Sequence, residues 1–342
     1  MNSKFLFYGM LYLLAISCSQ KNSPEPIEGI LQNSPSIEGK SDYINSPYVT
    51  AGNRVYMVGH QDGSFPEIGW HVKGEMGGVW LHPIKLMDGF DAVLSSGDNF
   101  LPLKGALSFI NYPSANVHYF DFDKSGIKAE RWQFVPDDRE GVFVQFVIKN
   151  NGEVSQDLNF ELTGHADLTP VWLGERTNME NGQDTAEWDK DLNAWRVSDG
   201  KSDWHLIYGL DREISVTGES PNALLGNGTS NTMSFSFKLL PGEQENINLI
   251  IAGSATSSET ADRTYRDLQQ NYATLLAQKN DRMASLAGFS KLSIPDKELE
   301  QTFEWLKYNC DWLVRDVPGI GTGISAGIPD YPWWFGVDSE YS

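Results

Sequence analysis

Residues 142–149 read VFVQFVIK, residues 150–152 read NNG, and residues 158–162 read LNFEL. The first segment is apolar and rich in β-branched and aromatic side chains, which is typical of a buried strand. The Asn-Asn-Gly segment predicts a turn, because these residues adopt the backbone angles that tight turns require. The alternation in LNFEL predicts a partner strand with one buried face and one exposed face.

The same period of two continues on both sides of this segment. Met233, Phe235 and Phe237 alternate with small or charged residues, and the Pro-Gly-Glu sequence at 241–243 turns the chain into the apolar residues 247–251. Short strands separated by turn signals, without helical windows between them, indicate an antiparallel sheet packed on another. We therefore predict an antiparallel β-sandwich domain over residues 48–255.

The period changes after residue 255 and predicts a linker helix over residues 256–288. Thr256 and Glu259 have the spacing of a capping box, and Gly288 is a typical helix end. Large apolar residues recur there at intervals of three and four, as one face of a helix requires. These residues are Tyr265, Leu268, Tyr272, Leu275, Leu276, Met283 and Leu286.

A second helix is expected after the Ser-Ile-Pro-Asp sequence at 293–296, which supplies an N-terminal cap. Its predicted buried stripe consists of Leu299, Phe303, Leu306, Cys310 and Leu313, and Trp305 and Trp312 widen that stripe. Both observations predict a helix covered on two sides, with Cys310 as a small buried hydrophobic residue. The chain has two cysteines, so no disulfide framework is expected.

The first residues resemble an export signal. Lys4 precedes an apolar run from Phe5 to Ile16, which is too short to span a bilayer but suits a signal peptide. Small residues before Cys18 resemble a bacterial lipobox, which implies cleavage and lipidation at that cysteine. We expect residues 1–18 to be a lipoprotein signal peptide, and residues 19–47, rich in Ser, Pro and Asn, to be a flexible tether. The alternative is an ordinary signal peptide with an incidental cysteine.

These features place the protein in the bacterial cell envelope, lipid-anchored in the periplasm or on the outer membrane, and the leaflet stays open. The formal net charge is −20, and no basic stripe offsets it, which excludes nucleic acid as a partner. Eleven Trp, 13 Tyr and 17 Phe suit the stacking of sugar rings, although aromatic residues also fill cores.

Residues 326–335 read AGIPDYPWWF and concentrate four aromatic side chains in an expected loop. Burying a large apolar side chain stabilises a fold by roughly 1.5–3 kcal/mol. A natural domain would use later segments to cover such a cluster, so we expect the sequence to be an N-terminal fragment of a longer protein.

Residues 326–341, AGIPDYPWWFGVDSEY, resemble the glycoside hydrolases of the glycogen-debranching and amylo-α-1,6-glucosidase class, relatives of glucoamylase. Residues 74–86, GEMGGVWLHPIKL, are also similar to a segment of that family. The resemblance implies an α+β multidomain fold: an antiparallel β-sandwich, a linker helix, and then the truncated start of an (α/α)6 helical barrel over residues 289–342.

The resemblance also implies a saccharide site. Asp338 would accept hydrogen bonds from sugar hydroxyls, while Trp334 and Phe335 would form the pocket wall. Val337 occupies a position where many relatives have Arg, so the recognised sugar stays open. The alternative is that the aromatic residues are core and that Asp338 caps a following helix.

The family uses two carboxylic acids for inverting hydrolysis. Both are expected beyond Ser342, and Glu340 has no partner carboxylate that would make it the general acid. The resulting hypothesis is a glycoside hydrolase that acts on α-glucan or a related oligo- or polysaccharide, without cofactor or metal, and a fragment without its catalytic acid and base. The alternatives are a non-catalytic glycan-binding surface lipoprotein and a structural lipoprotein without ligand.

Overall fold

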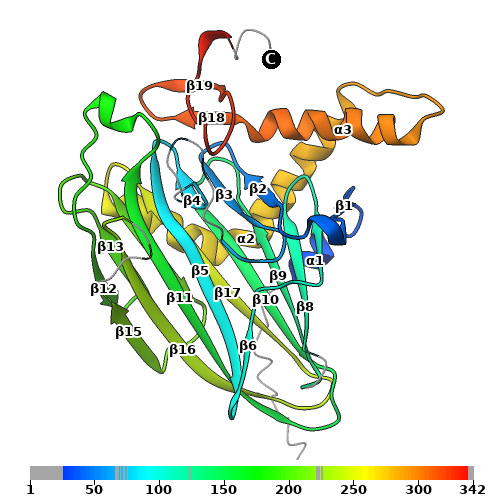
Figure 1. The fold of residues 1–342 in the computed structure, drawn as a ribbon, viewed down its shortest axis with the longest axis vertical. Coiled ribbons are helices and arrows are strands. Elements are labelled where there is room, and N and C mark those ends of the chain that lie inside the picture. The colour runs from blue at the N-terminus through cyan, green and yellow to red at the C-terminus, as the bar shows by residue number, and fades with distance from the viewer. Residues whose placement is uncertain are drawn as a thin grey trace, which may run out of the picture.

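The computed structural model describes residues 26–65, 69, 71, 74, 76–122, 125–220, 224 and 226–337. Cys18, Asp338 and Glu340 lie outside these residues. Strands make up 44% of the structure and helices 20%, so the fold is mostly β (Figure 1).

Two large antiparallel sheets form the body of the molecule. Sheet A has nine strands in the order β1 (Ile37–Glu38), β7 (Ser108–Asn111), β8 (Asn116–Phe122), β9 (Ile127–Phe134), β10 (Gly141–Asn150), β17 (Gln244–Ser254), β14 (His205–Leu210), β13 (Ala194–Ser198) and β12 (Thr185–Asp189). Sheet B has eight strands in the order β15 (Val216–Ser220), β16 (Thr229–Leu239), β11 (Gln156–Pro170), β5 (Ile84–Ser96), β4 (Gly78–Leu81), β3 (Val55–His60) and β2 (Pro47–Ala51), with β6 (Asn99–Pro102) paired to β5. The predicted antiparallel pairing is therefore confirmed.

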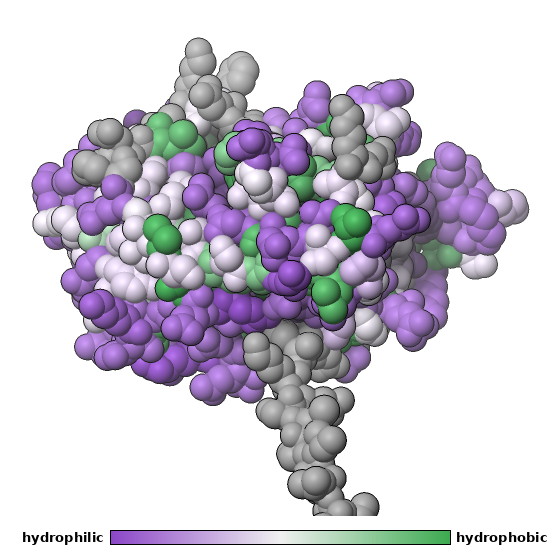
Figure 2. Space-filling model, turned by 90° about the horizontal axis from the view of Figure 1, so that it is seen from below, coloured by the Kyte–Doolittle hydropathy of each residue, from purple (hydrophilic) through white to green (hydrophobic). Residues whose placement is uncertain are grey.

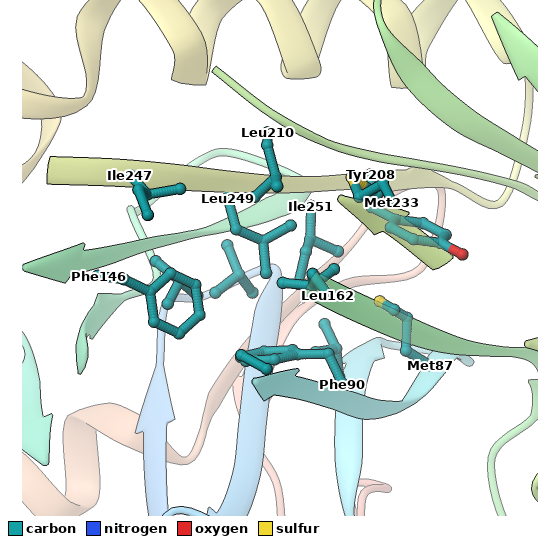
Figure 3. Packing of buried hydrophobic residues seen from close by; sticks show 14 of the residues in the cluster. Met87, Phe90, Phe146, Leu162, Tyr208, Leu210, Met233, Ile247, Leu249 and Ile251 are labelled. Atoms are coloured by element: carbon teal, nitrogen blue, oxygen red, sulfur yellow. The ribbon is translucent and has the colours of Figure 1, made fainter. Parts of the chain in front are cut away.

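The main core lies between the two sheets. Figure 3 shows Phe146 of sheet A and Leu162 of sheet B among the side chains that point toward one another there. The rings of Phe146 and Phe160 are 5.1 Å apart. By contrast, the surface seen from below is largely hydrophilic, with hydrophobic residues scattered across it (Figure 2). Burial of apolar side chains between the sheets is thus the main source of stability.

The turn at residues 150–152 does not form the predicted hairpin. β10 pairs with β9 and β17 in sheet A, whereas β11 pairs with β5 and β16 in sheet B. Asn150 fixes this turn, because its side-chain amide donates to the backbone oxygens of Val154 and Leu239 at 2.9 and 3.1 Å. The turn therefore carries the chain from one sheet to the other, and the two strands face each other across the core.

Helix α2 (Ser258–Gly288) lies on the outer face of sheet A. The Phe143 ring of β10 stacks on Tyr272 of α2, with centroids 4.2 Å apart. Val144, the next residue of β10, instead enters the core between the sheets. β10 is buried on both faces, which explains why residues 142–149 are almost continuously apolar.

The cap of α2 differs by one residue from the prediction. Ser257 is the N-cap, and its hydroxyl accepts a hydrogen bond from the Thr260 amide at 3.2 Å. One short helix, α1 (Ile27–Ile30), precedes the first strand, the 3-10 turn η1 (Ser41–Tyr43) lies between β1 and β2, and a further 3-10 turn, η2 (Gly174–Thr177), follows β11. No helix in the described part of the chain combines the length and the apolar character that a membrane crossing requires.

The predicted fold class is wrong in its helical part, since no start of an (α/α)6 barrel forms over the described residues after 288. One helix, α3 (Lys297–Trp312), is followed by a hairpin of β18 (Val314–Val317) and β19 (Gly321–Ile324). In Figure 1, α3 and this hairpin lie at the upper end of the sheets. The molecule is thus a β-sandwich with a helical and hairpin cover, and not an α+β multidomain chain.

The predicted buried face of α3 is correct for Trp305 and Trp312 and wrong for the residues beside them, and Asp296 is the N-cap as expected. Leu299 and Leu306 are each 53% exposed, and Cys310 is exposed rather than buried. The neighbouring stripe of aromatic residues is buried instead, because it packs on β2, β3 and β4. This stripe consists of Trp305, Tyr308 and Trp312.

Candidate functional site

The chain after β19 forms a tight loop over one end of the sandwich. The Ala326 amide donates to the Trp333 backbone oxygen at 3.1 Å, and Gly327 and Tyr331 form an isolated antiparallel β-bridge. The Trp333 indole N–H donates to the backbone oxygen of Trp172, which follows β11. This bond joins two segments that are distant in sequence and fixes where the loop's aromatic side chains lie.

Four rings from three segments meet at this place, and we call them the aromatic platform. His71 stacks on Trp172 with centroids 3.7 Å apart and planes 8° apart. Tyr331 stands edge-on to both, at 4.7 Å from His71 and 5.7 Å from Trp172. Phe335 lies 6.2 Å from Trp172 and 6.4 Å from Tyr331. Tyr331 is 42% exposed, so the platform reaches the surface.

Two buried polar atoms, one in the platform and one in the loop that carries Tyr331 and Phe335, have no hydrogen-bond partner among the described residues. They are Nε2 of His71 and Nε1 of Trp334, and both atoms are buried. Buried polar groups in folded proteins are nearly always paired, so unpaired ones mark places where a ligand or water supplies the partner. An apolar ring face beside unpaired polar atoms is the combination that a sugar ring requires.

Glycine positions the Trp334 indole. A Cβ atom on Gly323 would lie 3.0–3.1 Å from three indole atoms, closer than ordinary van der Waals contact. The backbone of β19 therefore approaches the Trp334 indole closely at Gly323. The absence of a side chain at Gly323 therefore determines how deeply the indole sits.

A buried positive charge lies in β18, in the hairpin that precedes the loop. Arg315 is fully buried and donates to the Trp312 backbone oxygen, and its guanidinium lies 5.2 Å from the Tyr56 ring. Burial lowers the pKa of Arg315 to about 10. Burial, and secondly the Arg315 charge, lower the pKa of His82 to about 3, so this imidazole is neutral at physiological pH. The His82 ring stands edge-on to Trp333 at 4.8 Å.

The structure brings some of the predicted site residues together. Phe335 is part of the platform and Trp334 lies close to Gly323 of β19, whereas Asp338 falls outside the described residues, so its role stays a prediction. His71 and Trp172 were missed by the sequence reasoning. The placement of Trp172 directly after a long strand was a signal, because loops at strand ends carry many binding residues.

A second polar group is buried where β5 begins and β11 ends. Asp88, Asp167, Asp184 and Asp199 are all at most 9% exposed, and Lys85 pairs with Asp88 and lies 3.8 Å from Asp167. Burial, followed by the charges of the other three carboxylates, raises the pKa of Asp184 to about 8. No group of His, Cys, Asp or Glu within the described ranges has the arrangement that a metal ion needs.

No protein-family model matches the sequence, and no curated protein matches it. Solved structures do resemble it. A protein named "Putative kojibiose phosphorylase from human microbiome" superposes with a TM-score of 0.57 and 10% identity, over 85% of this chain and 43% of that chain. A bacterial glucoamylase complexed with acarbose gives a TM-score of 0.47 and 8% identity, over 81% of this chain and 40% of that one.

The similarity to the phosphorylase shows that this chain shares its fold with part of a carbohydrate-active enzyme. The chain spans less than half the length of that neighbour. The similarity to the glucoamylase is too weak to add to this conclusion.

Proposed function

We propose that the chain is the glycan-binding part of a carbohydrate-active enzyme, and that the aromatic platform holds a sugar ring. The observation that carries this proposal is the stacked pair of His71 and Trp172, bordered by Tyr331 and Phe335. The C–H face of a pyranose packs on an aromatic face, and its hydroxyls need polar partners at the edge. Nε2 of His71, which is buried and has no partner among the described residues, would be such a partner in the platform.

The finer assignment is a glycoside hydrolase that acts on α-glucan or a related glycan by inverting acid/base hydrolysis. The resemblance of residues 326–341 supports it, and Asp338 is then a further acceptor for sugar hydroxyls. The named activity of the phosphorylase neighbour supports a glucose-containing oligosaccharide as the ligand. The signal-like residues before Cys18 support a lipid-anchored protein of the bacterial envelope.

A non-catalytic glycan-binding surface lipoprotein is the second candidate. The segment 326–337 carries a single carboxylate, Asp330, whereas inverting hydrolysis requires two. Analysis of products after incubation of the complete encoded protein with maltooligosaccharides and phosphate separates the two candidates. Binding with hydrolysis or phosphorolysis supports the enzyme, and binding with intact oligosaccharide supports the second candidate.

Isothermal titration with maltoheptaose and with kojibiose tests the binding site itself. Trp172→Ala removes the stacking face but keeps the backbone oxygen that accepts from Trp333. Loss of this contact should weaken binding about tenfold or more, as expected for roughly 1.5–3 kcal/mol of lost apolar burial. Phe100→Ala is the matched control, because Phe100 is a 72% exposed aromatic residue on β6. Equal affinity of Trp172→Ala and the wild type, or no binding by the wild type, would contradict the proposal.

A further inference from the structure

Three neighbouring strands of sheet B place a serine, a histidine and an aspartate in contact on the face turned away from the core. Nδ1 of His165 lies 2.9 Å from Oγ of Ser230, and Nε2 of His165 lies 3.2 Å from Oδ2 of Asp91. His165 of β11 pairs directly with Ser230 of β16. Asp91 of β5 pairs with Thr163, two residues before the histidine, and therefore reaches it diagonally.

The hydrogen-bond pattern selects one tautomer of the neutral imidazole. If Nε2 carries the proton, it donates to Asp91, and Nδ1 accepts the Ser230 hydroxyl proton. In the other tautomer, the lone pair of Nε2 would face an oxygen of the Asp91 carboxylate, and these two acceptors would repel each other. The favoured tautomer is the one in which a histidine acts as a general base toward a serine while a carboxylate holds its ring.

Two further observations support this arrangement. The hydrogen bond from His165 lowers the pKa of Asp91 below its usual value, so the carboxylate is ionised at neutral pH. The register between β11 and β5 shifts between His165 and Ala166, where Asp88 has no paired residue on β11. Such β-bulges increase the local twist and redirect side chains, and they are frequent beside active sites.

We propose that Ser230, His165 and Asp91 transfer an acyl group from an ester to water. The Ser230 oxygen attacks the ester carbonyl as its proton moves to Nδ1 of His165. The ester C–O bond then breaks, and the departing alcohol takes that proton, which leaves an acyl-serine. Water attacks this intermediate, gives a proton to His165, and releases the carboxylic acid while the proton returns to Ser230. Asp91 is a positioning residue that orients the ring and stabilises the imidazolium.

The position of the three residues limits the substrate class. They lie on an open sheet face, with the Asp91 side chain 59% exposed, and not in a deep cavity. A short acyl group that projects from a larger polar molecule can reach such a face, because the rest of that molecule can contact the surrounding surface. A small free ester would make few contacts there. The inferred substrate is therefore a short-chain acyl ester on a polymeric or oligomeric alcohol.

Labelling with a fluorophosphonate probe, followed by peptide mass spectrometry, tests whether Ser230 is nucleophilic. We expect the probe on Ser230 of the wild type, and no label at this site in Ser230→Ala. Ser236→Ala is the matched control: Ser236 lies on the same strand, is exposed, and contacts Asn159 at 3.3 Å instead of a histidine. An unlabelled wild type, or loss of the label in Ser236→Ala, overturns the proposal.

Hydrolysis of an acetylated oligosaccharide supplies the second readout. His165→Gln should lower kcat about 100-fold or more, which is the contribution of a general base. Asp91→Asn should lower kcat with KM unchanged, and Asp91→Glu should recover part of the loss. Wild-type rates equal to those of Ser230→Ala, with melting temperatures unchanged, would refute an acyl-transfer site.

Discussion

Replacing Asp184 by Asn should change the pH dependence of stability in a predictable direction. The Asp184 side chain is 3% exposed, and its Oδ2 accepts the Leu168 amide at 2.8 Å. Its Oδ1 has no hydrogen-bond partner among the described residues. Burial, and then the charges of Asp167, Asp199 and Asp88, favour the protonated carboxyl and raise its pKa from 3.8 to about 8.

The direction of this pH dependence is set by which state of the protein, folded or unfolded, holds the Asp184 proton. Between pH 4 and pH 8 the folded protein keeps the Asp184 proton, whereas the unfolded chain has released it. Unfolding therefore becomes easier as the pH rises through this range. At 1.36 kcal/mol per pKa unit, the shift from 3.8 to about 8 corresponds to a loss on the order of 5 kcal/mol by pH 8.

The Asp184→Asn variant has a neutral side chain at every pH, and its oxygen can still accept the Leu168 amide. Between pH 5 and pH 8.5, its free energy of unfolding should rise relative to that of the wild type by about 4 kcal/mol. Any cost of the new amide group is independent of pH and cancels in this comparison. Urea unfolding followed by tryptophan fluorescence at both pH values measures the difference.

Asp157→Asn is the control, because the Asp157 side chain is 83% exposed. At both pH values, the free energy of unfolding of this variant should equal that of the wild type within about 0.5 kcal/mol, as is usual for surface substitutions. If the difference between Asp184→Asn and the wild type were the same at pH 5 and pH 8.5, the explanation of a protonated buried carboxyl would be wrong.

Four further substitutions test the cover of the sandwich. Gly323→Ala should push the Trp334 indole from its place and weaken oligosaccharide binding about fivefold, for an overpacking cost of about 1 kcal/mol, as measured by titration calorimetry. Gly336→Ala, where no atom lies within 4 Å of the added methyl group, should bind like the wild type. Leu306→Gln should change the free energy of unfolding by about 0.5 kcal/mol or less, because Leu306 is exposed. Trp312→Ala should lower it by about 3–5 kcal/mol, because Trp312 is buried. Equal effects of the two substitutions in urea unfolding would contradict the observed buried face of α3.

The sandwich could be predicted because its strands alternate polar and apolar residues, as β16 does at residues 233–237. The pairing of β10 could not be predicted in the same way. Both faces of β10 are apolar, since Phe143 contacts α2 and Phe146 contacts the other sheet. A strand without a polar face carries no signal that tells which neighbour it joins or in which sheet it lies.

The buried face of α3 was ambiguous for a related reason. Its sequence carries one stripe with Leu299 and Leu306 and a second with Trp305 and Trp312, and both have helical spacing. Aromatic side chains bury more surface than leucines, so packing the tryptophans on the sandwich stabilises the fold more. Periodicity alone gives no weight to that difference.

The contact of Asp91, His165 and Ser230 could not be predicted from the sequence either. These residues come from three strands, and their contact depends on the register of both pairings and on the bulge after His165. No local motif marks them, because a shift of one residue in either pairing would turn His165 toward the opposite face of the sheet. Such a site becomes visible when the register is known.

The aromatic platform depends on the sandwich in the same way. Residues 326–337 include little regular structure, yet the loop is held by the bond from Trp333 to the Trp172 backbone. The preceding hairpin is fixed by the Asp316 amide, which donates to Asn53 at 2.8 Å, and by the buried Arg315. The residue types of the platform can be read from the sequence, but their mutual geometry is set by strands more than 100 residues away. A fragment of the C-terminal segment without the sandwich would therefore lack the platform.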